Sequence, residues 1–164
     1  MKAFQFFLML TISSAALPAI AQTSSSLCAG EETTYFSCQA GKAKQILSLC
    51  GTPKKTLQYR YGTRSNAELT YPIDPANGWA QMAIAHYSRY QTEREELSFS
   101  VNGVSYTVFD YTEHGQRDAG IQVTLRDGHE QERRCQGKVT GSLSTLINIV
   151  PCDKDSALSS GSCN

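Results

Sequence analysis

Carboxylates near the middle of the chain are the side chains best suited to acid–base chemistry. Asp110 and Glu113 flank a charged loop, and Glu93, Glu95 and Glu96 lie in a short run before them. Two carboxyl groups can act together as acid and base, or acid and nucleophile, on a glycosidic bond. A small secreted hydrolase that uses an acid pair near Asp110 and Glu113 is therefore one hypothesis. Because any small protein offers such a pair, and the run at 93–96 is typical of a solvated face, we do not predict an enzyme.

The histidines predict no metal site. His86, His114 and His129 show neither the H-x-H nor the H-x-x-x-H spacing that is typical of zinc ligands. The run at 153–155 begins like a calcium loop, but the ligand and the glycine that should follow are missing. No G-x-S-x-G nucleophile motif is present. We therefore expect no catalytic residue, no cofactor and no metal.

The cysteines predict a disulfide-stapled protein in an oxidising compartment. All six lie after residue 21: Cys28, Cys38, Cys50, Cys135, Cys152 and Cys163. An even number of cysteines behind an export signal is typical of disulfides, and six cysteines allow 15 connectivities. Neighbouring strands would favour Cys28–Cys50, a barrel seam between the first and last strands would favour Cys38–Cys135, and Cys152–Cys163 would staple the tail.

The first 21 residues have the pattern of a secretory signal peptide. Lys2 is followed by an apolar run over 4–16 and by Ala19-Ile20-Ala21, a typical cleavage site. The apolar run is too short for a membrane anchor. We predict a single β-barrel-like domain over 22–164 that is periplasmic or secreted. The chain has 15 basic and 15 acidic residues, so nothing in its charge indicates a nucleic acid or a membrane as partner.

Two alternating runs that meet at Asn102-Gly103 predict a β-hairpin over 96–111. Asn-Gly is the strongest short-range signal for a two-residue type I′ turn. In that register Val101 faces Val104, Phe99 faces Tyr106 and Leu97 faces Val108, while the serines lie on the other face. Phe109 and Tyr111 fall on the serine side. Either a C-terminal helix covers that side, or the two rings form a partly exposed aromatic patch.

The rest of the chain predicts a mainly β fold. Short alternating segments separated by turn residues indicate about eight strands, including 32–38, 44–49, 57–61, 67–71, 121–126 and 131–135. The segment 79–87 fits a strand by alternation and a helix by its alanines, and we predict a strand. Apolar residues at i, i+3, i+4 and i+7 predict a short helix over 141–150. Together these elements predict a single antiparallel β-barrel or rolled sheet with a short C-terminal helix.

Several motifs resemble a group of small exported proteobacterial proteins, mostly of unknown function. They include F-S-C at 36–38, S-L-C at 48–50 and L-Q-Y-R-Y-G at 57–62, and the similarity covers most of the chain after the signal peptide. More loosely, an exported disulfide-bonded barrel of this size is similar to the periplasmic lysozyme inhibitors. Those families present an S-G-x-x-Y segment to the lysozyme cleft, and the segment 102–106 matches it with Asn102 in place of the serine.

The resemblance implies a non-enzymatic binding protein whose partner is a lysozyme or another protein. The binding residues it suggests are Asn102, Gly103, Ser105 and Tyr106, and the aromatic side chain of Tyr111 is a further candidate. A tight turn would place Tyr106 on the core face, so an inhibitory role requires a longer, open loop. The alternatives are the hydrolase described above and an envelope structural or adhesin-like module.

Overall fold

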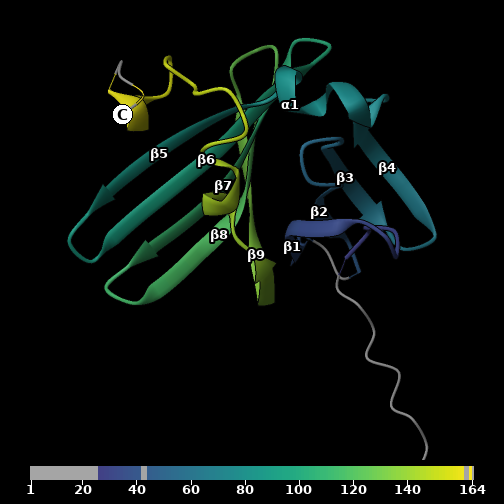
Figure 1. The fold of residues 1–164 in the computed structure, drawn as a ribbon, viewed down its shortest axis with the longest axis horizontal. Helices are drawn as coiled ribbons and strands as arrows, with labels where there is room; N and C mark the ends of the chain where they lie inside the picture. Colours follow the sequence, from purple (N-terminus) through teal and green to yellow (C-terminus); the bar gives the residue numbers. More distant parts are fainter. Residues whose placement is uncertain (1–25, 42–43, 161–162, 164) are drawn as a thin grey trace, which may run out of the picture.

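Nine strands form one antiparallel sheet in the computed structural model, which describes residues 26–41, 44–160 and 163 (Figure 1). The predicted signal peptide lies outside these residues. The sheet order is β4-β3-β2-β1-β9-β8-β7-β6-β5. The strands are β1 (Thr33–Ala40), β2 (Ile46–Gly51), β3 (Gln58–Thr63), β4 (Asn66–Tyr71), β5 (Ala83–Arg89), β6 (Thr92–Val101), β7 (Val104–Glu113), β8 (Gln116–Thr124) and β9 (Glu130–Gly141).

The long strand β9 rolls this sheet. Its first half pairs with β8, from Glu130 opposite Thr124 to Arg134 opposite Gly120, and its second half pairs with β1. The sheet thereby bends into two arms, β5–β8 and β1–β4, which lie on the left and right of Figure 1. Since β4 and β5 are the two ends of the order, the sheet is a half-barrel rather than a closed barrel. The prediction of a mainly β, rolled antiparallel sheet is confirmed.

The predicted central hairpin is confirmed residue by residue. Asn102 and Gly103 have φ angles of 51° and 77°, as a type I′ turn requires. Val101 pairs with Val104, Phe99 with Tyr106 and Leu97 with Val108. We call the face that carries Leu97 and Val108 the concave face, because it points into the core between the two arms.

Aromatic rings join the two arms across the core. The Phe99 ring lies 5.1 Å from Tyr106 on its own arm, and 4.8 Å from Tyr71 and 4.9 Å from Tyr59 on the other arm. Leucines from both arms, Leu47 and Leu97 among them, are fully buried around these rings. Each buried side chain of this size stabilises the fold by about 1.5–3 kcal/mol, so this cluster keeps the half-barrel together.

The predicted C-terminal helix is a single 3-10 turn, η2 (Leu143–Leu146), and it packs on the concave face. Leu143, Leu146 and Val150 are buried in the core, so the apolar pattern identified the right residues but not the length of the helix. After η2 the chain reaches the edge of β5, where the Pro151 carbonyl accepts a hydrogen bond from the Ile84 N–H (2.8 Å), and Pro151 cannot continue a helix.

The predicted strand over 79–87 is partly wrong. Residues 78–81 form a helical turn, α1 (Gly78–Gln81), and β5 begins at Ala83. The helical turn follows a 3-10 turn, η1 (Pro75–Asn77), that the Asp74 side chain caps by accepting a hydrogen bond from the Ala76 N–H. Gly78 packs directly against the backbone of Leu57, where a Cβ atom would lie 1.7 Å from the carbonyl oxygen. This contact keeps α1 against the start of β3.

All three predicted disulfides are present. They link Cys28 to Cys50, Cys38 to Cys135 and Cys152 to Cys163, with Cα atoms 5.2–5.9 Å apart. Disulfides are typical of proteins outside the cytoplasm, because cytosolic thiols are kept reduced. A last 3-10 turn, η3 (Ala157–Ser159), follows Cys152. Within the described residues, no helix is long and apolar enough to cross a membrane.

Candidate functional site

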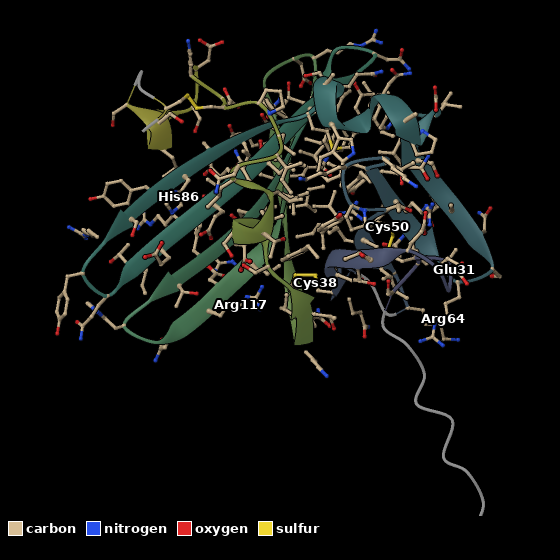
Figure 2. All side chains as sticks on the ribbon, viewed as in Figure 1. Glu31, Cys38, Cys50, Arg64, His86 and Arg117 are labelled. Carbon is tan, nitrogen blue, oxygen red and sulfur yellow. A yellow bond between two sulfur atoms is a disulfide. The ribbon has the colours of Figure 1, made fainter. Side chains whose placement is uncertain are left out.

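A polar groove lies on the concave face of β5–β8, beyond the end of the apolar core. Moving along each strand in steps of two keeps the same face, so Leu97 is followed by Glu95 and Val108 by Asp110. The groove has a volume of about 380 Å³. Its lining residues are Glu93, Glu95, Asp110, Thr112, Arg117, Ser142 and Ser144. His86 on β5 and Arg117 on β8 mark opposite sides of the arm in Figure 2.

The carboxylate of Asp110 accepts three hydrogen bonds. Arg117 donates to both of its oxygens, at 2.7 and 2.8 Å, and the Leu143 N–H donates to Oδ2 at 3.3 Å. Arg117 also donates to the Gly141 carbonyl at 2.8 Å, and its guanidinium lies over the Phe36 ring. Asp110 is only 3% exposed. This group therefore ties η2 to the sheet, and its three hydrogen bonds and its ion pair with Arg117 hold Asp110 in a structural role.

Glu95 is buried next to Asp110 but has no such partners. It pairs with Asp110 in the β6–β7 register and is 5% exposed, yet it accepts no hydrogen bond from any described residue. The nearest cationic group is the His86 ring, whose Nε2 lies 3.9 Å from Oε1. Burial, followed by the negative charge of Asp110, raises the pKa of Glu95 to about 7.

Glu93 lies two residues before Glu95 on the same face and is half exposed. Ser88 donates a hydrogen bond to Oε1 at 2.5 Å, and His86 Nε2 lies 3.2 Å from Oε2. These hydrogen bonds, that of Ser88 first, lower the pKa of Glu93. His86 thus lies between two carboxylates of different character, one buried and one solvated.

The structure does not bring Asp110 and Glu113 together. Residues three apart on a strand point to opposite faces, and Glu113 forms an ion pair with Arg94 on the outer face. The acid pair suggested by the sequence is therefore not a pair in space. The carboxylate that does lie beside Asp110 is Glu95, which sequence reasoning placed on a solvated face.

The aromatic residues on the outer face do not form an exposed patch. Phe109 is 4% exposed and lies 5.2 Å from the half-buried Tyr111 ring. Tyr111 donates a hydrogen bond to Glu96, and the Ser156 hydroxyl donates to the other Glu96 oxygen at 3.1 Å. Burial raises the pKa of Tyr111. The C-terminal tail therefore reaches this face through Ser156, whereas η2, the candidate cover, lies on the concave face.

The other predicted binding residues gather at the far end of the hairpin. Asn102, Gly103 and Ser105 are exposed, and Arg126 donates a hydrogen bond to the Asn102 carbonyl at 2.6 Å. Tyr106 is half buried and stacks on Phe99. The turn is tight, so Tyr106 faces the core rather than an open loop. Tyr111 lies at the opposite end of β7.

No protein-family model, no curated protein and no solved structure matches this chain. The functional argument therefore rests on the geometry of the groove. His86 and Glu95 were missed as a pair, because they are far enough apart in sequence to look unrelated. Their only sequence signal is that they lie equally far from the turn between β5 and β6, His86 before it and Glu95 after it. This spacing makes them partners across the hairpin, on the concave face.

Glu95 should make stability depend on pH. Its pKa is higher in the folded protein (about 7) than the usual 4.5, so its contribution is fully present below pH 4.5 and is lost as pH rises to 7. The loss should be about 2–3 kcal/mol. Denaturant unfolding of the parent protein and of Glu95→Gln is measured as a function of pH, in buffer with a chelator. The difference between the two pH profiles gives the contribution of Glu95 to the free energy of unfolding. A constant difference from pH 4 to 8 would show that folding does not raise the pKa of Glu95.

Proposed function

We propose that this chain is an exported, non-enzymatic binding protein, periplasmic or secreted, that recognises a protein partner through the groove on the concave face of β5–β8. Three disulfides and the predicted signal peptide support an extracytoplasmic location. The observation that carries the proposal is the groove itself, a polar recess built on paired strands and bounded by η2. Sites on strands hold their side chains more rigidly than sites on loops.

The hydrogen bonding of the carboxylates favours binding over catalysis. A glycosidase needs two free carboxyl groups on either side of the scissile bond. Asp110 is bound by Arg117 and the Leu143 N–H, and Glu113 lies on the other face with Arg94. Of the two other carboxylates that line the groove, Glu93 accepts a hydrogen bond from Ser88 and lies 3.2 Å from His86 Nε2, whereas Glu95 accepts no hydrogen bond from the described residues. A partner that brings hydrogen-bond donors into the groove would complete their hydrogen bonding.

A lysozyme is the partner class that we propose to test first, because the loose resemblance to periplasmic lysozyme inhibitors implies it. In this proposal the contact surface is the groove rather than the Asn102-Gly103 turn. The tight turn and the core-facing Tyr106 support this choice, since an inhibitory tyrosine must be exposed. The two surfaces lie at opposite ends of β7, so one experiment can separate them.

The test compares two substitutions on β7. Thr112→Arg fills the groove, and Ser105→Arg places the same side chain beside the exposed turn. Inhibition of c-, g- and i-type lysozymes is measured for the purified mature protein and both variants. We expect inhibition of at least one type, a loss of at least tenfold with Thr112→Arg, and no change with Ser105→Arg. The reverse pattern would assign binding to the turn, and no inhibition by the parent protein would overturn the lysozyme proposal.

A further inference from the structure

We propose that His86, Glu93 and Glu95 form a binding site for a divalent transition-metal cation, for which Zn²⁺ is the probe. The three side chains lie on the concave face of one hairpin, where His86 pairs with Glu95 and Ser88 with Glu93. Each offers one ligand atom, and these atoms all lie within 4.8 Å of one another. This inference does not depend on the identity of the protein partner proposed above.

The distances between the ligand atoms suit a small cation. His86 Nε2 lies 3.2 Å from Glu93 Oε2 and 3.9 Å from Glu95 Oε1. Bonds of about 2.0–2.1 Å in tetrahedral geometry place neighbouring ligand atoms about 3.3 Å apart. The observed distances bracket this value. The two carboxylate ligand atoms lie within 4.8 Å of each other, so binding requires the His86 ring and the half-exposed Glu93 side chain to turn toward a common centre.

The burial of Glu95 is an independent indication of a ligand. A buried carboxylate is costly unless charge or hydrogen bonds compensate it. Glu95 is 5% exposed and accepts no hydrogen bond from the described part of the chain. The neighbouring cation, Arg117, is already committed to Asp110 and the Gly141 carbonyl. A bound dication would supply the missing partner to the oxygen that faces His86.

The ligand set also indicates which metal class would bind. Imidazole nitrogen suits Zn²⁺ and its neighbours in the transition series, whereas Ca²⁺ and Mg²⁺ prefer oxygen ligands alone. Three protein ligands leave a fourth position open, as in catalytic rather than structural zinc sites. The Ser88 hydroxyl orients Glu93 by its hydrogen bond to the second carboxylate oxygen, at 2.5 Å. The open position can take water or a group from a molecule in the groove.

A second cluster of potential ligands does not compete with this site. Cys28, Glu32 and Cys50 also bring ligand atoms close together. The two cysteines form a disulfide, and Glu32 accepts hydrogen bonds from Arg60 at 2.7 Å to both oxygens. A sulfur in a disulfide is no thiolate ligand, so this cluster has no metal-binding capacity.

The test uses the full mature protein, stripped with a chelator and titrated with ZnCl₂ by calorimetry. We expect one Zn²⁺ per chain, tighter binding of Zn²⁺ than of Ca²⁺, and at least tenfold weaker binding in His86→Ala and in Glu95→Gln. The chain has three histidines in all, so His114→Ala and His129→Ala are matched controls and should bind Zn²⁺ as the parent does.

A spectroscopic measurement on the unsubstituted protein keeps the test independent of variant stability. Zn²⁺ should shift the imidazole ¹⁵N resonances of one histidine, and assignment should identify it as His86. Shifts confined to His114 or His129, the absence of binding at 1 mM Zn²⁺, or unchanged affinity in a folded His86→Ala protein would each overturn the proposal. The lysozyme assay, run with and without chelator, is a separate readout, so the two proposals can fail independently.

Discussion

Replacing the Cys38–Cys135 disulfide with alanines is expected to lower the free energy of unfolding by about 4–5 kcal/mol. The bridge spans 97 residues and joins β1 to β9, the junction at which the sheet rolls. Cross-linking a loop of this length reduces the entropy of the unfolded chain more than any shorter bridge does. Cys38 is fully buried, so the substitution also leaves a small void in the core. Denaturant unfolding of Cys38→Ala/Cys135→Ala under oxidising conditions measures the loss.

The tail disulfide provides the matched control for this prediction. Cys152–Cys163 spans only 11 residues and lies outside the core, so Cys152→Ala/Cys163→Ala should cost about 3 kcal/mol or less. The difference between the two variants tests whether β9 needs its covalent link to β1. Equal losses from both would show that loop length and the position of the bridge do not decide its contribution.

Arg117→Met is expected to destabilise the protein by about 3–5 kcal/mol, the range for removing one partner of a buried ion pair. Asp110 would keep its burial and lose two of its three hydrogen bonds. Because the Arg117 side chain is one-third exposed, water can reach part of the pair, and we expect the lower half of that range. Chemical denaturation at pH 7 measures the effect.

Two further variants test the reason for this loss. Arg134→Met removes an arginine from the exposed ion pairs with Glu132 and Asp118 and should leave the denaturation midpoint close to that of the parent. Asp110→Asn combined with Arg117→Met should recover part of the loss, because a neutral amide does not leave a buried charge unpaired. If the Arg117→Met and Arg134→Met variants were equally stable, Asp110 would not depend on its partner.

The Asp110–Arg117 pair also bears on function, because it forms one wall of the groove. It attaches η2 through the Leu143 N–H and the β9 terminus through the Gly141 carbonyl. Its loss should therefore disturb Ser142 and Ser144, which line the groove beside it. Because Arg117 donates to Asp110 and the Gly141 carbonyl, it makes no hydrogen bond to Glu95. On the hairpin β5–β6, Glu93 is held by Ser88 and His86, and Glu95 is the groove carboxylate without a hydrogen bond from the described residues.

Local patterns in the sequence were sufficient for the hairpin, the presence of disulfides and the fold class. The Asn102-Gly103 turn and the strict alternation around it allow one register only, since a shift by one residue would bury serines. The even number of cysteines indicated disulfides, and the predicted strand neighbours identified Cys28–Cys50 and Cys38–Cys135. The hairpin depends on residues close in sequence, and the presence of disulfides depends on chemistry that is independent of the fold. The Cys38–Cys135 pairing, between residues 97 apart, depended on the expectation that the first and last strands are neighbours.

The tertiary structure alone decided the length of the C-terminal helix and the grouping of the charged residues. The apolar spacing at 143–150 predicted a buried face of a helix. In the structure only η2 is helical, and the chain after it is held to β5 by the hydrogen bond from the Ile84 N–H to the Pro151 carbonyl. Asp110 separates from Glu113 and meets Arg117, while Glu95 meets His86, because pairing between strands decides which side chains share a face. Periodicity describes one strand at a time. The distance between charges on different strands depends on the register and on which segments exclude water, and both are properties of the whole sheet.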